Sequence, residues 1–323
     1  MLERILDAEH QLSCNAGLSR HAYSQLEAAQ MKTPWGRANR LRFALVGEGA
    51  AAMASATRCS FAGVLDQQPI RVCAIGDVLA APEFGNDRHA RELVERLVEA
   101  AARDGDDLAL LFSNDVAGRG HDGFEPIRMT DVTLGIAQSP RHGAPMALIR
   151  GGEPRDSAAI VAMGRVRAST FRFHLDRDID LLEHAIARNR LLAGLGPNGA
   201  RELHFFIAEE GITAAAYVVI SVTGEAWTLE ECGDRDLSGA RVGAILQALI
   251  ARQPAERRPV IRAWLPPGFL PPQVTILSAQ PAMERIAVRP IGAGRPRLEL
   301  SPADVLYWRN DCALHLPRTV TSQ

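Results

Sequence analysis

The 323-residue sequence contains a single lysine, Lys32, so arginine carries nearly all of its positive charge. Acidic and basic residues almost balance, and the formal net charge is −2. This balance excludes the basic footprint of a nucleic-acid-binding protein and the polybasic patch of a membrane-surface protein. A composition rich in arginine and alanine is typical of GC-rich coding, and we expect a bacterial protein.

Cysteine is scarce, and no C-x-x-C pair occurs among Cys14, Cys59, Cys73, Cys232 and Cys312. We therefore expect neither a disulfide framework nor a structural zinc site. The nine histidines show no metal-ligand spacing, so no metal is expected. Residues 1–14 lack the regions of a signal peptide, and no uninterrupted apolar run approaches about 18 residues. These absences predict a cytoplasmic protein without a membrane partner.

The spacing of apolar residues changes along the first half of the chain. Residues 1–35 are predicted to be helical, and strands are predicted at 41–46, 52–61, 70–81, 108–112, 124–127 and 132–137. A helix is predicted from His89 to Arg103. Its apolar residues recur at positions i, i+3, i+4 and i+7, beginning at Ala90, and charges fill the other face.

A stretch rich in glycine and proline, residues 139–155, predicts a linker. Beyond it, helices (158–167, 179–195), three strands (203–209, 214–222, 226–232), a helix (243–252) and two strands (259–265, 283–290) repeat the earlier order. We therefore predict an N-terminal helical segment at 1–35 packing on a first domain at 36–138. A divergent second copy follows at 156–315, with a tail at 316–323.

The most informative unit is the strand, loop, helix and strand that span residues 71–113. Four stretches carry it: GDVLAAPEF from Gly76, HARELVERL from His89, LLFS from Leu110 and GFEPI from Gly123. In order and spacing they resemble the GCN5-related N-acetyltransferases over about residues 40–138. Two tandem copies are also similar to the enhanced-intracellular-survival acetyltransferases. The resemblance implies an α/β (α+β) fold whose mixed, mostly antiparallel sheet has splayed central parallel strands flanked by helices.

The resemblance also implies acetyl-CoA as a substrate and a small-molecule or peptide amine as the acceptor; an oligomer is compatible with it. The pantetheine arm would bond to strand backbone at Val78, Leu79 and Ala80. A helix N-terminus leaves backbone N–H groups unpaired and can bind a pyrophosphate. The residues expected around that pyrophosphate are Asn86, Asp87, Arg88, His89, Ala90 and Arg91. Ser113 and Asn114, at the end of the neighbouring strand, would lie near the thioester.

The phosphate loop departs from the pattern of these enzymes, which reads Gln/Arg-x-x-Gly-x-Gly/Ala. With Ala90 as the final small residue, Gly85 stands where Gln or Arg is expected and Arg88 stands where glycine is expected. Asp87 adds negative charge where a diphosphate would bind. Arg88 could contact the phosphate or fill its space, and both alternatives stay open.

The residue at the position of the general acid also differs from the pattern of these enzymes. The position that many of these enzymes give to a tyrosine is Arg119, which cannot donate a proton usefully at neutral pH. No tyrosine occurs between Tyr23 and Tyr217. His121 is our candidate acid, since the reference pKa of histidine, about 6.5, suits proton transfer; a solvated loop histidine is the alternative.

These observations support two functions. The first is an acyl-CoA-dependent N-acyltransferase that moves an acetyl or other short acyl group to an amine. The alternative is a non-catalytic acetyltransferase-like module that senses a ligand or binds a protein. The acidic cluster at residues 230–236 adds three alternatives: a second CoA site, a salt-bridged structural loop, or a wall of the acceptor site.

Overall fold

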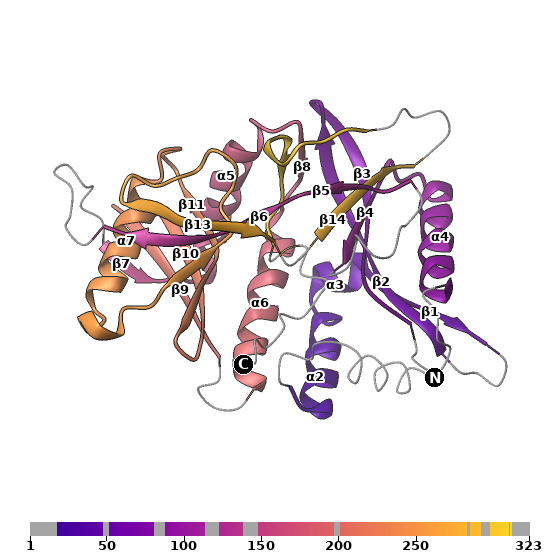
Figure 1. Ribbon diagram of the computed structural model, residues 1–323, viewed down its shortest axis with the longest axis horizontal. Coiled ribbons are helices and arrows are strands. Elements are labelled where there is room, and N and C mark those ends of the chain that lie inside the picture. The colour runs from indigo at the N-terminus through magenta and orange to yellow at the C-terminus, as the bar shows by residue number, and fades with distance from the viewer. Residues whose placement is uncertain are drawn as a thin grey trace.

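The computed structural model describes residues 18–47, 52–80, 88–113, 123–137, 148–196, 201–282, 285–291, 298–309 and 311. Figure 1 shows two sheets side by side with helices around and between them. The helices are α2 (Arg20–Gln30), α3 (Pro34–Asn39), α4 (Arg88–Arg103), α5 (Ser157–Ala168), α6 (Ile179–Leu195) and α7 (Ala240–Ala251).

The strands fall into two sheets. The first contains β1 (Arg40–Val46), β2 (Ala52–Leu65), β3 (Gln68–Ala80), β4 (Leu108–Ser113), β5 (Glu125–Ile127), β8 (Phe173–Leu175), β14 (Arg285–Pro290) and β15 (Val305–Leu306). The second contains β6 (Thr130–Ile136), β7 (Leu148–Gly151), β9 (Glu202–Glu210), β10 (Thr213–Thr223), β11 (Ala226–Asp234), β12 (Ile261–Ala263) and β13 (Val274–Pro281).

The first sheet has the order β15-β8-β2-β3-β4-β14-β5, with β1 beside β2. Helix α4 covers one face, because its apolar stripe packs on the alternate residues that β3 and β4 point toward it. Cys73 and Ile75 of β3 and Leu111 of β4 belong to that layer. The opposite face turns toward the second half of the chain.

The second sheet has the order β13-β6-β12-β11-β10-β9-β7. Helix α7 packs on one face through a buried apolar stripe that includes Val242, Ile245 and Leu249. Helices α5 and α6 pack on the other face, against residues such as Ile207 and Tyr217. The central unit of each sheet is a strand, a helix and a parallel strand: β3-α4-β4 in one and β11-α7-β12 in the other.

The two sheets exchange a strand. After β5 the chain leaves the first sheet, and β6 inserts between β12 and β13 of the second. After β13 it returns, and β14 inserts between β4 and β5 of the first. Each sheet therefore has, beside its parallel strand, a strand from the other half. Neither sheet is complete without both halves of the chain.

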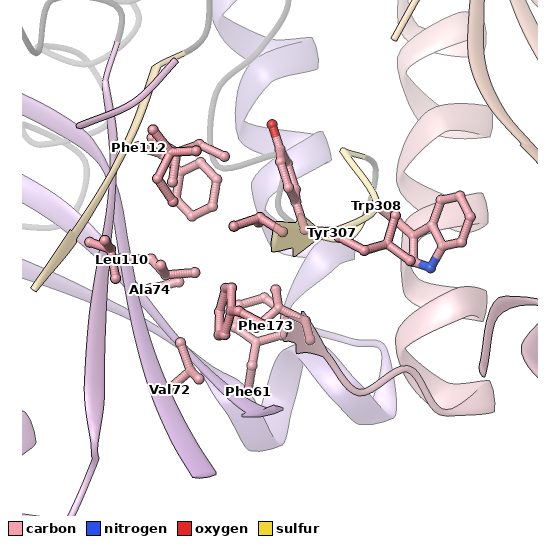
Figure 2. Close-up of a cluster of buried hydrophobic side chains, with 14 of the residues drawn as sticks. Phe61, Val72, Ala74, Leu110, Phe112, Phe173, Tyr307 and Trp308 are labelled. Carbon is pink, nitrogen blue, oxygen red and sulfur yellow. The ribbon is translucent and has the colours of Figure 1, made fainter. Parts of the chain in front are cut away.

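A continuous apolar core joins the halves on the inner face of the first sheet. Figure 2 shows Phe61, Val72, Ala74, Leu110 and Phe112, from β2, β3 and β4, in one cluster with Phe173 of β8 and with Tyr307 and Trp308, all three from later in the chain. All of these side chains are buried. Truncating a buried aromatic of this kind typically costs about 3–5 kcal/mol of stability, so this contact fixes how the halves meet.

The structure confirms the predicted fold class. Both sheets are mixed and mostly antiparallel, their central parallel strands pair over a short length, and helices flank them. The predicted linker contains a strand, β7, which pairs with β9. The predicted domain limits at 138 and 156 divide the chain by sequence. Each sheet, however, combines strands from before and after those limits. Within the described residues, no helix is both long and apolar enough to cross a membrane.

Candidate functional site

The central parallel strands of the first sheet separate part-way along their length. Pairing between β3 and β4 runs from Val72 with Leu108 to Ile75 with Leu111. Beyond that last pair, β3 continues to Ala80 and β4 to Ser113, and no further pairing of the two occurs among the described residues. Strand backbone on the β4 side of β3 is therefore available for bonds to a ligand.

A β-bulge lies in β3 just where the strands separate. Thr57 of β2 pairs with Gly76 and Ser55 pairs with Leu79, so Asp77 and Val78 together oppose one residue of β2. Asp77 has a φ of 49°, in the left-handed region that residues other than glycine rarely adopt. Bulges re-aim side chains and interrupt pairing, and they are frequent beside active sites. The bulge turns the backbone at Val78 out of the regular ladder with β2.

Helix α4 begins at Arg88, after the loop that follows β3. Its first turn contains Arg88, His89 and Arg91 and no acidic residue. Positive charge is unfavourable beside the positive end of a helix dipole, and a bound anion would offset it. Arg88 and Arg91 are exposed, whereas Ala90 is buried against the sheet. The geometry suits a phosphate group at this end of α4.

The side chain of Asp77 lies on the face of the sheet opposite α4. It accepts a hydrogen bond from the Thr57 hydroxyl (3.3 Å) and lies 3.9 Å from the guanidinium of Arg40. Glu27 of α2 accepts bonds from Arg40 (2.8 Å) and Arg42 (2.9 Å). The bulge is thus supported by a buried charged network that α2 and β1 supply.

Helix α6, from the second half of the chain, completes this region. The hydroxyl of Thr33 lies 2.7 Å from Nδ1 of His184, and Trp35 packs on the imidazole ring. Burial, together with the charges of Arg188 and Arg40, lowers the pKa of His184 to about 4. Burial also lowers the pKa of Arg188 to about 10, although Asp77 and Glu27 act in the opposite direction. At neutral pH His184 is therefore neutral and Arg188 charged, next to the network around the bulge.

The nearby thiols are not nucleophiles. Cys59 and Cys73 are buried in β2 and β3. Burial raises the pKa of each to about 12, against a counteracting effect of Arg40 on Cys59 and of Arg58 on Cys73. Since the thiolate is the reactive form, neither thiol is suited to act as a nucleophile at neutral pH.

The second sheet repeats the geometry of the first. Parallel pairing of β11 with β12 extends over three residues, from Trp227 with Ile261 to Leu229 with Ala263. Beyond it, β11 contains an extra residue, Glu230, relative to β10. Both halves therefore have a bulge where a strand leaves its parallel neighbour, followed by a helix.

The helix N-terminus of the second half is already occupied. The Asp234 carboxylate accepts hydrogen bonds from the backbone N–H groups of Asp236 (2.9 Å), Arg241 (2.8 Å) and Val242 (3.4 Å). It also accepts one from the Arg241 guanidinium (3.1 Å), and its side chain is fully buried. An internal carboxylate thus stands where a phosphate would bind, which argues against a CoA site in this half.

The rest of the acidic cluster is also internally paired, as in a salt-bridged structural loop. Glu231 accepts bonds from Arg177, at 2.5 and 3.0 Å, and from the Tyr217 hydroxyl. Arg177 also donates to Asp311 (2.8 Å), and all four groups are buried. Glu230 accepts a bond from the Ser221 hydroxyl. These contacts fasten the C-terminal segment to the second sheet.

The structure brings several of the predicted site residues together. Val78, Leu79 and Ala80 lie on the part of β3 that extends beyond its pairing with β4. Arg88, His89, Ala90 and Arg91 form the first turn of α4. Ser113 ends β4. Gly85, Asn86, Asp87, Asn114, Arg119 and His121 lie outside the described residues, so their roles stay predictions.

Some residues beside the site were missed by the sequence reasoning. Asp77 stands inside an apolar strand, and its bulge has no signature in the sequence. His184 and Arg188 lie on α6, more than 100 residues beyond the bulge in the chain. Their positions follow from packing between the halves, so pattern reading within one half could not have found them.

The fold is similar to those of solved acetyltransferase structures. A conserved protein of unknown function from Enterococcus faecalis V583, described as a probable N-acyltransferase, matches with 11% identity and a TM-score of 0.63; the match covers 90% of this chain and 70% of that chain. A GCN5-related N-acetyltransferase from Kribbella flavida matches with 16% identity and a TM-score of 0.63, covering 89% and 68%. A GCN5-related N-acetyltransferase from Anabaena variabilis ATCC 29413 matches with 12% identity and a TM-score of 0.56, covering 84% and 71%.

These matches establish the fold, at identities too low to carry a substrate across. No protein-family model matches the sequence, and comparison with curated proteins finds no match.

Proposed function

We propose that this chain, which has the fold of the GCN5-related N-acetyltransferases, is an acyl-CoA-dependent N-acyltransferase with one site, in the first sheet. The observation that carries the proposal is the separation of β3 from β4 at a bulge, with the basic first turn of α4 following it. The second sheet shares the geometry, but Asp234 fills the position of the phosphate.

In this proposal the pantetheine arm lies between the separated strands and bonds to backbone at Val78–Ala80. The diphosphate lies at the start of α4, beside Arg88 and Arg91. Backbone N–H at the bulge polarises the thioester carbonyl, so that charge developing on its oxygen is stabilised. The acceptor, a small-molecule or peptide amine, approaches from the face that carries Asp77. The two substrates react because they are held together.

Titration of acetyl-CoA into the purified protein by calorimetry tests the proposal. We expect saturable heat, and a thermal shift in a separate melting experiment. An absence of both at millimolar ligand would contradict the proposal. Release of the CoA thiol, followed across a panel of primary amines, then identifies acceptors.

The second candidate function is a non-catalytic module with the same fold that binds acyl-CoA or a related ligand. The residues at the motif positions favour it: Gly85 and Arg88 in the phosphate loop, and Arg119 in place of the tyrosine. Saturable binding without thiol release for any amine would support this function over the enzyme.

A further inference from the structure

A tyrosine from the far end of the chain lies beside the opening between β3 and β4. Tyr307 follows β15 and is 2% exposed. Its ring centroid is 6.1 Å from that of Phe112, edge-on, and 5.3 Å from that of Trp264. Figure 2 shows the Tyr307 ring across from Phe112, with its hydroxyl pointing in the direction in which β4 runs from Leu110 to Phe112.

Phe112 marks the beginning of the opening. It comes directly after Leu111, the last residue of β4 that pairs with β3. If the pairing continued, Phe112 would face Gly76, the residue before the bulge. Phe112 and Leu110 share the face of the sheet opposite α4, and Asp77 lies on this face as well, beside Thr57. Tyr307 therefore lies at the point of separation, on the face from which the acceptor approaches in the proposed function.

The reaction needs an acid at this place. When the acceptor amine attacks the thioester carbonyl, a C–N bond forms, the C–S bond breaks and the electron pair leaves on sulfur as a thiolate. Arg119, at the motif position, holds its proton too tightly to donate it. A phenol is a competent donor to a thiolate, and the chain has only three tyrosines, at positions 23, 217 and 307.

We propose that Tyr307 is the general acid of the acyl transfer. Its phenol donates a proton to the departing CoA sulfur, which leaves as the thiol. The proton that the acceptor nitrogen loses restores the phenol through solvent, so the products are the amide and free CoA. The second half of the chain thus contributes a catalytic residue to the site of the first, because β15, directly before Tyr307, joins the first sheet by pairing with β8. This inference rests on the proposed function.

The test is the Tyr307→Phe variant, which keeps the ring contacts with Phe112 and Trp264. We expect acetyl-CoA affinity within about twofold of the wild type. We expect the rate of thiol release, with the best acceptor amine of the panel, to fall by about 100-fold, because positioned acid catalysis contributes about 10²–10⁴-fold. Tyr23→Phe, in the buried cluster between α2 and α6, removes the same hydroxyl elsewhere and should keep the wild-type rate.

A second measurement does not need an acceptor. If the Tyr307 hydroxyl contacts the sulfur, it favours bound CoA as the thiolate. The affinity for free CoA should then rise with pH, over the range in which its thiol ionises, more steeply in the wild type than in Tyr307→Phe. Desulfo-CoA should bind both proteins equally at every pH.

The outcomes separate this inference from the proposed function. If the wild type binds no acetyl-CoA, both are wrong. If it binds and Tyr307→Phe matches it in rate and in the pH dependence of CoA binding, the assignment of Tyr307 is wrong and the proposed function stands. A 100-fold loss in His121→Gln, with none in Tyr307→Phe, would return the role of acid to His121.

Discussion

The carboxylate of Asp234 lies 2.8 Å from the backbone nitrogen of Arg241, in the first turn of α7. In the first half, the matching helix begins with Arg88, His89 and Arg91 and no acidic residue. The second half of the chain thus carries its own anion at the helix terminus, whereas the first half presents positive charge there. We therefore expect calorimetry to give one acetyl-CoA per chain. Two equivalent sites would contradict this interpretation of Asp234.

Asp234 should also be important for stability. Asp234→Ala removes the acceptor of two α7 backbone N–H groups and a partner of the Arg241 guanidinium. Breaking a buried pair from one side leaves charge and donors uncompensated, so we expect unfolding free energy to fall by about 3 kcal/mol. Urea denaturation measures it. Asp236→Ala is the matched control, since Asp236 is an exposed acid in the same loop; an equal loss in both variants would contradict the assignment.

A pH-dependent contribution to stability follows from His184. Its pKa falls from 6.5 in the unfolded chain to about 4 in the folded one, through burial and the charges of Arg188 and Arg40. The neutral ring of His184 makes its full contribution to the free energy of unfolding above pH 6.5. This contribution is lost as pH falls toward 4, because the unfolded chain binds the proton first.

Comparison with His184→Gln isolates this effect. The unfolding free energy of the wild type, relative to the variant, should decline by about 3 kcal/mol over that interval. Urea titrations at half-unit pH steps measure the difference. Parallel profiles for the two proteins would show that His184 titrates alike in the folded and unfolded chains.

The buried Arg177 should contribute more to the free energy of unfolding than an exposed arginine in a similar ion pair. Arg177→Leu leaves Glu231 and Asp311 buried without their shared cation. We expect a loss of about 3–5 kcal/mol at pH 8. Burial raises the pKa of Asp311 to about 7 even against Arg177, so protonation should make the loss smaller at pH 6. Arg172→Leu, which breaks an exposed pair with Asp66, should have little effect at either pH.

The sequence predicts the elements well because their patterns are local. The stripe from Ala90 to Ala101 is the buried face of α4, and the strands predicted in both halves form. Strands β7, β8, β13 and β15 are not predicted from the sequence. The resemblance places the backbone of Val78–Ala80 at the opening between the strands. Local patterns of this kind can be recognised without knowing which distant residues pack against them.

The remaining features depend on contacts between distant parts of the chain. Residues 132–137 read correctly as a strand, but nothing in them indicates that β6 pairs with β12 and β13. Tyr307 follows a two-residue strand, β15, too short to be predicted from periodicity. In the sequence Asp234 is one member of the acidic cluster at residues 230–236, and only the position of α7 shows that its carboxylate binds the N-terminal N–H groups of that helix. Tertiary packing decides each of these cases.

The phosphate end of the site can be tested at Arg88, where the sequence leaves two alternatives. Arg88 is exposed in the first turn of α4, next to the positive helix terminus. If it contacts the diphosphate, Arg88→Ala should weaken acetyl-CoA binding by about tenfold, the loss expected for one charge-assisted hydrogen bond. If it fills space that the phosphate needs, Arg88→Gly should strengthen binding.

Arg96→Ala is the control, since Arg96 lies two turns further along the same helix and pairs with Glu92 at 2.5 Å. It should bind acetyl-CoA as the wild type does. A ligand without the diphosphate, acetyl-pantetheine, provides a second control. Its affinity should be the same for the wild type and Arg88→Ala. Equal affinities for wild type, Arg88→Ala and Arg88→Gly would move the diphosphate away from the first turn of α4.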